Sequence, residues 1–195
     1  MSGSGFMDAG SFKEPSLLEA YLMAATSRLI GGYYRKYVES LGLRGTEKIL
    51  EYGSGSGAAS RYLVRALPDG YLTCVDISKV WMRFARRAVG RCSNVDFLWG
   101  DLAGLPIEPG SRDGVFFHFV LHDLPQGERA EKVSLLARKL KKGGKVYIRE
   151  PTGEKHGMPA AEIRAITAAA GLAEISSGTG KSPEGWPTFE GIYVT

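Results

Sequence analysis

The sequence has little cysteine and no long apolar run, and both absences exclude whole classes of protein. Its 195 residues include two cysteines, Cys74 and Cys92, which form no C-x-x-C pair. This spacing excludes a disulfide framework and a zinc ribbon, and favours a reducing, cytoplasmic setting. The longest apolar stretch near the N-terminus, residues 17–30, is interrupted by Glu19 and Arg28 and falls short of the roughly 20 residues that span a membrane. We therefore expect no membrane span, and the first residues show no secretory signal.

An excess of charge of one sign is also missing. The chain has 25 Lys+Arg against 21 Asp+Glu, which gives a formal net charge of +4. Its basic runs, residues 86–87 and 138–145, fall on expected helix faces or in a turn, and no aromatic residues are interleaved with them. Such runs usually solvate a surface, so a nucleic-acid partner is not expected.

What the chain does have is an alternation of short strands and helices. Apolar residues at three- and four-residue spacing predict a helix over 16–41, broken at Gly31-Gly32. The expected strands are 48–52, 71–75, 95–99, 114–119, 145–149, 172–177 and 188–195, and the helices between them are 58–67, 80–89, 126–142 and 159–170. This order predicts a three-layer, Rossmann-like α/β fold, in which a seven-stranded, mostly parallel sheet carries helices on both faces. We expect residues 1–15 to be a flexible leader, 16–42 a helical N-terminal cap, and 43–195 the rest of the same domain.

Glycine is abundant, with 26 residues, and three of them form a glycine loop over residues 53–57. Gly53, Gly55 and Gly57 lie between an expected strand and a helix, where glycine allows positive backbone angles and close approach of a ligand. Asp76 ends the next strand, where a carboxylate can accept hydrogen bonds from ribose hydroxyls. The pattern predicts a nucleotide site. The loop alone does not exclude NAD, because Gly53, Gly55 and Ala58 also satisfy the looser dinucleotide pattern, but the Tyr and Lys pair of small dehydrogenases is absent.

In this setting the segment from Glu51 to Gly57 resembles motif I of the class I S-adenosylmethionine-dependent methyltransferases. Segments 74–78, 100–106, 113–124 and 136–150 resemble further motifs of that family, in the same order along the chain. The similarity is to small-molecule methyltransferases of the ubiquinone/menaquinone-biosynthesis-like group. It implies transfer of the methyl group of S-adenosylmethionine to a small-molecule acceptor, with S-adenosylhomocysteine as product.

The resemblance also implies roles for individual residues. Glu51 would shape the glycine loop, Asp76 would bind the ribose, and Asp101 would accept from the adenine amino group. Phe117 and His118, expected just beyond the fourth strand, would face the sulfonium end of the cofactor. The residues expected to contact the cofactor are Glu51, Gly53, Ser54, Gly55, Gly57, Asp76, Ile77, Asp101, Leu102, Phe117 and His118.

Two histidines, His118 and His122, are the candidates for catalysis. Both are expected in the loop after the fourth strand, where the methyl group should point, and one of them would deprotonate or orient the acceptor. The alternative is that His122 and Asp123 only cap that loop. A metal site is not expected, because Phe119 replaces the acid of an H-E-x-x-H motif and no third ligand is evident.

The acceptor pocket is expected in the cap and in the loops after the fourth and fifth strands. Tyr33 and Tyr37 lie four residues apart on the cap, and Glu150 and His156 belong to the segment after the fifth strand. Tyrosines at this spacing are more often part of a core-facing helix than of a lid. Two other functions stay open: methylation of RNA or protein, disfavoured by the lack of an Asn-Pro-Pro-Tyr type motif, and cofactor binding without catalysis.

Overall fold

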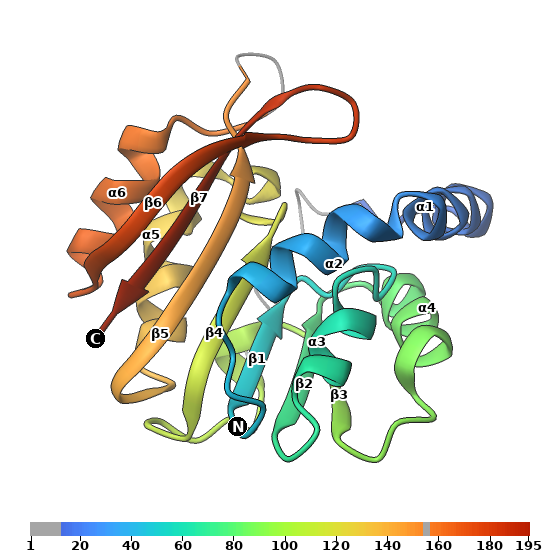
Figure 1. Cartoon of the computed structure of the whole chain (residues 1–195), viewed down its shortest axis with the longest axis horizontal. Coiled ribbons are helices and arrows are strands. Elements are labelled where there is room, and N and C mark those ends of the chain that lie inside the picture. The colour runs from blue at the N-terminus through green and yellow to red at the C-terminus, as the bar shows by residue number, and fades with distance from the viewer. Residues whose placement is uncertain (1–12, 154–156) are drawn as a thin grey trace, which may run out of the picture.

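The computed structural model describes residues 13–153 and 157–195, and within them a seven-stranded sheet lies between two layers of helices (Figure 1). The strands are β1 (Lys48–Tyr52), β2 (Tyr71–Asp76), β3 (Val95–Trp99), β4 (Arg112–His118), β5 (Leu140–Pro151), β6 (Ala173–Lys181) and β7 (Pro187–Val194). The helices are α1 (Leu17–Leu29), α2 (Gly31–Ser40), α3 (Ser60–Ala66), α4 (Lys79–Val89), α5 (Gln126–Ala137) and α6 (Ala160–Ala169), with short 3₁₀ turns η1 (Leu102–Gly104) and η2 (Leu121–Asp123). The predicted fold class is confirmed.

The order of the strands in the sheet is β3-β2-β1-β4-β5-β7-β6. Strand β7 runs antiparallel to both of its neighbours, and the other pairs are parallel. The strand order reverses between β1 and β4, where the chain has travelled outward through β2 and β3 and then returned. In open α/β sheets a ligand crevice forms beyond the carboxyl ends of the strands at such a reversal.

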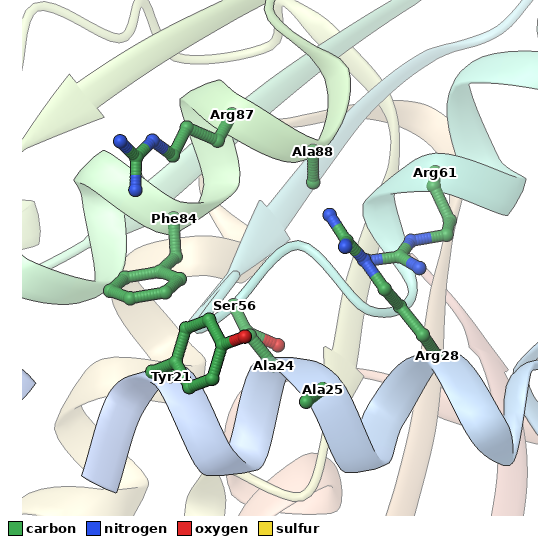
Figure 2. A pocket seen from close by; sticks show the side chains of 9 residues that line it. All are labelled: Tyr21, Ala24, Ala25, Arg28, Ser56, Arg61, Phe84, Arg87 and Ala88. Atoms are coloured by element: carbon green, nitrogen blue, oxygen red, sulfur yellow. The ribbon is translucent and has the colours of Figure 1, made fainter. Parts of the chain in front are cut away.

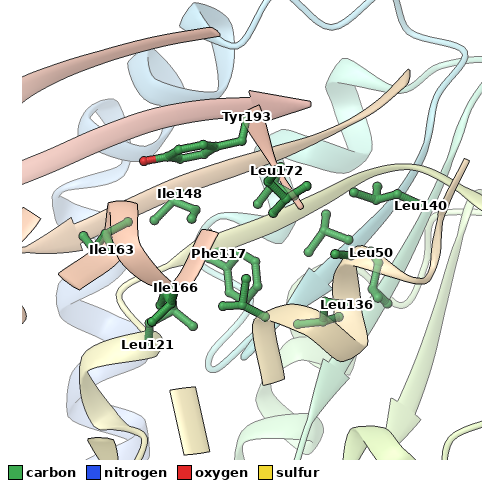
Figure 3. Packing of buried hydrophobic residues seen from close by; sticks show 14 of the residues in the cluster. Leu50, Phe117, Leu121, Leu136, Leu140, Ile148, Ile163, Ile166, Leu172 and Tyr193 are labelled. Carbon is green, nitrogen blue, oxygen red and sulfur yellow. The ribbon is translucent and has the colours of Figure 1, made fainter. Parts of the chain in front are cut away.

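Each face of the sheet has its own core. Helices α2 and α3 cover one face, where Tyr37, Leu63 and Phe116 are buried together. Helices α5 and α6 cover the other, where Phe117 and Ile163 are among the buried residues (Figure 3). Phe116 and Phe117 are consecutive in β4 and face opposite ways because side chains alternate along a strand.

The junction between α5 and β5 differs from the prediction. The prediction of a helix over 126–142, up to Gly143-Gly144, was wrong, because α5 ends at Ala137 and β5 begins at Leu140. The carbonyl of Lys139 accepts hydrogen bonds from the backbone of Ser111 and Arg112, so the chain pairs with β4 before it reaches the glycines. The two glycines lie inside β5, at the irregularity where its register with β4 shifts.

The N-terminal cap breaks where the sequence predicts. Helix α1 ends at Leu29 and α2 begins at Gly31, where a Cβ would overlap the hydroxyl of Tyr62. Residues 1–12 of the expected leader lie outside the described residues. Glu14 belongs to the fold, because its carboxylate accepts from the Ser78 hydroxyl (3.0 Å) and the Val80 amide (2.7 Å) at the start of α4. No helix in residues 13–153 and 157–195 is both long enough and apolar enough to cross a membrane.

Candidate functional site

Two loops meet at the strand reversal. The glycine loop follows β1, and the segment Phe119–Asp123, here called the β4 loop, follows β4. Gly53 (φ 72°), Gly55 (φ 51°) and Gly57 (φ 76°) all have positive φ. A Cβ on Gly53 would overlap the side chain of Val120, so the two loops touch at that point. A Cβ on Gly55 would have no atom nearer than the Gly53 carbonyl oxygen at 4.0 Å, which leaves room for a ligand against the backbone.

Asp76 fixes the glycine loop to the end of β2. Its Oδ2 accepts from the Gly55 amide at 2.7 Å and its Oδ1 from the Ser78 amide at 2.9 Å. Burial raises the pKa of this carboxyl above its usual value, against the lowering effect of these amides. A carboxylate has about four lone-pair positions, so these amides leave room for a further donor. Beside it, Ser54 has a buried hydroxyl with no hydrogen-bond partner in the described part of the chain.

Glu51 lies under the glycine loop and has few partners. Its carboxylate accepts from the Ser60 hydroxyl at 2.5 Å and lies 3.5 Å from the Cys74 thiol. Burial raises the pKa of Glu51 to about 7, and these two contacts only partly oppose it. A carboxyl group beneath the loop is therefore only partly ionised at neutral pH.

The β4 loop is held by Glu150 of β5, which is fully buried. The Glu150 carboxylate accepts from the amides of Val120 (2.9 Å) and Leu121 (2.8 Å), and Oε2 lies 2.7 Å from His122 Nδ1. Burial opposes the charged form of His122, but the hydrogen bond and charge of Glu150 raise its pKa above the usual value. Phe119 has a φ of 56°, which is unusual for a residue with a side chain and shows how tightly the loop turns.

His118, the last residue of β4, sits in an aromatic cluster beneath α2. Its ring lies near those of Tyr33, Tyr34 and Tyr37 at centroid distances of 6.1, 5.2 and 5.7 Å. Burial lowers the pKa of His118 to about 3, and the positive charge of Arg149 lowers it further, so the imidazole is neutral near pH 7. The Arg149 guanidinium lies 4.0 Å from the centre of the Tyr33 ring and 4.4 Å from that of Tyr37.

Several polar atoms in this cluster have no hydrogen-bond partner in the residues that the structure describes. They are His118 Nε2, Tyr33 Oη, and Arg149 Nε and Nη1, all of them buried. Arg149 Nη2 does pair with Glu190 of β7, at 2.7 Å. Buried donors and acceptors without partners are costly, and their gathering at one edge of the sheet is typical of a site that a polar ligand completes.

Comparisons with known proteins agree with this geometry. Residues 49–144 match the family model described as a methyltransferase domain. The chain is 30% identical over 117 residues to demethylmenaquinone methyltransferase of Staphylococcus aureus, covering 60% of this chain and 48% of that protein. It is 29% identical over 118 residues to 3-hydroxy-5-methyl-1-naphthoate 3-O-methyltransferase of Streptomyces sahachiroi, covering 60% of this chain and 34% of that protein. The crystal structure of an S-adenosylmethionine-dependent methyltransferase from Aquifex aeolicus superposes with a TM-score of 0.74 at 20% identity, over 93% of this chain and 99% of the other.

The chain carries a methyltransferase domain over residues 49–144, in the fold of the class I S-adenosylmethionine-dependent methyltransferases. It spans between a third and a half of the length of these two curated relatives. The cofactor of the family is S-adenosylmethionine, and the glycine loop fits it. The fit rests on the room beside Gly55, on the Ser54 hydroxyl, which has no partner within the described residues, and on the acceptor capacity that Asp76 keeps beyond its amide hydrogen bonds. Ile77, which follows Asp76 and is 46% exposed, provides an apolar surface next to them.

Other expected cofactor residues of this chain lie differently from the sequence prediction. Phe117 lies within β4, as the strand predicted over 114–119 has it, and is buried in the α5–α6 core, which corrects the expectation that it lies just beyond the strand. His118 also belongs to β4, not to the loop after it, and its ring faces α2. Leu102 is buried in the same core as Phe117. Asp101 forms an ion pair with Lys132 at 2.7 Å, and its side chain remains about one-third exposed.

The residues expected to shape the acceptor pocket also lie in different surroundings, some at the edge of the aromatic cluster and others in the core. Tyr33 is only partly buried at the edge of the cluster, whereas Tyr37 is a core residue with 5% exposure. Glu150 is buried against the β4 loop, and His156 lies outside the described residues. The described ranges 13–153 and 157–195 contain no group of three His, Cys, Asp or Glu side chains that could hold a metal ion.

Sequence reasoning missed Arg149, the cation of the aromatic cluster. A signal for it was available in the alternation of β5, where Tyr147 faces the α2–α3 core. Arg149 comes two residues later and shares that face, so a charged side chain was placed on an otherwise apolar surface beside the crevice. The contact between Gly53 and Val120 left no such signal, because it depends on the pairing of β1 with β4.

Proposed function

We propose that this chain transfers the methyl group of S-adenosylmethionine to a small-molecule acceptor. The observation that carries the proposal is the position of the Asp76-fixed glycine loop next to a cluster of buried polar atoms without partners. The first fits the cofactor, and the second fits a polar group of the acceptor. When bound, S-adenosylmethionine supplies a methyl group already activated by the positive sulfonium.

The chain's own residues would mainly hold and align the reactants. In the proposal, Asp76 binds the ribose and the glycine-loop backbone holds the methionine part. His118 is neutral near pH 7 and has Nε2 free to form a hydrogen bond in the described structure. With a pKa of about 3 it is a weak base, so we assign it to orienting the acceptor and not to removing a proton. His122 is committed to Glu150 and serves to position the β4 loop.

The acceptor class follows from the aromatic cluster and the curated relatives. Tyr33 and Tyr34 present partly buried rings beside His118, which suits a planar acceptor. The two relatives described above are named for a hydroxynaphthoate and for demethylmenaquinone, which are both ring compounds. We therefore propose an aromatic ring compound as the acceptor, methylated in a reducing, cytoplasmic compartment where Cys74 and Cys92 stay free thiols. Nucleic acid and protein are not proposed as acceptors.

Calorimetric titration with S-adenosylmethionine, S-adenosylhomocysteine and NAD tests the cofactor. We expect both adenosyl ligands to bind and NAD not to bind; binding of NAD alone would overturn the proposal. Incubation with methyl-labelled cofactor and a panel of hydroxylated naphthalenes and quinols then tests catalysis. Label transferred to an acceptor supports methyl transfer, while tight cofactor binding without a labelled product supports the non-catalytic alternative.

A further inference from the structure

A pocket that adjoins the glycine loop lies under helix α1 and includes side chains that the site described above does not. It has a volume of about 240 Å³ and is bounded by α1, the glycine loop, α3 and α4 (Figure 2). Its polar and aromatic walls come from Tyr21 and Arg28 of α1, Ser56 of the glycine loop, Arg61 of α3, and Phe84 and Arg87 of α4. The segments that form it are far apart in sequence, so the pocket exists only when α1 rests on the domain.

The charged residues that line this pocket are all positive. Arg28, Arg61 and Arg87 line it, and no carboxylate is among its lining residues. None of the three has an ion pair or side-chain hydrogen bond in the part of the chain that the structure covers. Other arginines do find acidic partners, such as Arg129 with Glu162 at 2.9 Å and Arg164 with Glu174 at 3.0 Å.

Two of these guanidinium groups lie near enough for their charges to interact. Figure 2 shows the side chain of Arg28 extending from α1 until its end lies beside that of Arg61. Burial lowers the pKa of Arg61 below its usual value, and the charge of Arg28 lowers it further. Arg61 is partly buried and Arg28 is exposed; their like charges repel one another, and an anion between them would reverse the sign of the interaction.

The geometry points to an anion site: we propose that this pocket binds the carboxylate or phosphate group of a small molecule, with Arg28 and Arg61 as its main partners. Guanidinium groups present paired N–H donors that match the oxygens of either group. The Ser56 hydroxyl offers a further donor, and the rings of Tyr21 and Phe84 form an apolar wall for the rest of the ligand. The anion would join α1 to α3 and to the glycine loop.

Such a group has two possible sources. One is the amino-acid end of the cofactor, since Ser56 belongs to the glycine loop. The other is a separate acidic small molecule, such as an aromatic carboxylate. The inference concerns an anion site and does not rest on methyl transfer, so its test uses ligands for both sources.

Calorimetry on the full chain distinguishes the sources. The variant is Arg28→Gln/Arg61→Gln, and the matched control is Arg65→Gln, on the same helix as Arg61 but outside the pocket, with its guanidinium over the Tyr62 ring. The probes are S-adenosylhomocysteine, 5′-methylthioadenosine (which lacks the amino-acid end), benzoate and inorganic phosphate. If the cofactor supplies the anion, the double variant binds S-adenosylhomocysteine about tenfold or more weakly and 5′-methylthioadenosine unchanged.

If a separate molecule supplies the anion, benzoate or phosphate binds the wild type and loses about tenfold or more in the double variant, while S-adenosylhomocysteine binds equally well. Arg65→Gln should match the wild type in both cases. Equal binding of every probe to the wild type and the double variant, or binding of none of them to the wild type, overturns the proposal. Should the double variant fail to fold, Arg28→Gln alone, at an exposed position of α1, repeats the comparison.

Discussion

The two loops at the strand reversal are built on opposite principles. The glycine loop rests on Glu51 and Asp76, two buried carboxyls whose pKa values burial raises. The β4 loop rests on Glu150, whose carboxylate receives backbone amides and the ring of His122. The glycine loop keeps hydrogen-bonding positions and backbone available to a ligand, whereas the hydrogen-bonding positions of Glu150 are taken by groups of the β4 loop. The difference indicates that the ligand completes the glycine loop, while the β4 loop is already fixed as a wall.

The strongest test of this comparison removes the carboxylate from the β4 loop. Glu150→Ala leaves the amides of Val120 and Leu121 and the ring of His122 without their acceptor, which should cost about 3–5 kcal/mol of unfolding free energy. Urea denaturation followed by circular dichroism measures this loss. A loss below about 1 kcal/mol would show that the β4 loop does not depend on Glu150.

The second test adds a side chain at the point where the two loops touch. Gly53→Ala adds a methyl group that overlaps Val120 and forces a side chain into a φ of 72°, so we expect a loss of about 2–4 kcal/mol. The control Gly55→Ala makes no overlap, since the nearest atom is the Gly53 carbonyl oxygen at 4.0 Å, and should lose only about 1–2 kcal/mol, from backbone strain. In the double variant Gly53→Ala/Val120→Ala the overlap is relieved. Denaturation should then show recovery of the part of the stability loss that the overlap causes, but not of the part that backbone strain causes. Full additivity of the two changes would contradict the contact between the loops.

The third test applies one substitution to both buried glutamates. Because the pKa of Glu51 is raised to about 7, folding takes up a proton between pH 4.5 and 7, and stability falls as the pH rises through that window. Glu51→Gln removes the buried charge and should stabilise the ligand-free protein at pH 8 by about 2–3 kcal/mol, with little effect at pH 4.5. Glu150→Gln should destabilise it at both pH values. The same sign for both variants at pH 8 would remove the distinction between the loops.

The smallest effect concerns the histidine in the aromatic cluster. The pKa of His118 is lowered to about 3, so the unfolded chain binds a proton below pH 6.5 that the folded chain does not. Stability should therefore fall by about 1.4 kcal/mol per pH unit below pH 6.5 through this group, and His118→Phe should remove that slope. His122→Gln is the contrasting variant. The raised pKa of His122 makes its contribution to stability complete below pH 6.5 and lost as the pH rises. Thermal unfolding from pH 5 to 9 therefore separates the effects of the two histidines.

Much of this arrangement was predictable from the sequence because it depends on local patterns. The glycine loop, the Asp at the end of β2 and the break at Gly31-Gly32 each follow from neighbouring residues, and the structure places them as expected. Seven strands in a mostly parallel sheet followed from the alternation of periodicities.

The features that were not predictable depend on pairing between distant strands. The early start of β5 follows from hydrogen bonds of Lys139 to the beginning of β4, which outweigh the helix-forming residues before Gly143. The burial of Phe117 depends on how far β4 extends, and the role of Glu150 depends on the β4 loop returning over β5. No local spacing carries that information, since tertiary contacts decide it.

The pairing of β1 with β4 also has a kinetic consequence. Its register joins Ile49 to Gly114, so this pair closes only after the whole β2–β3 segment between them has been looped out. Pairings between residues so distant in the chain form slowly, because the loop entropy is lost before the contacts are gained. The crevice lies between these two strands, so the ligand site should be among the last parts of the molecule to assemble. A nascent chain that has emerged only as far as β3 contains the complete glycine loop but not the wall against which a ligand would be held.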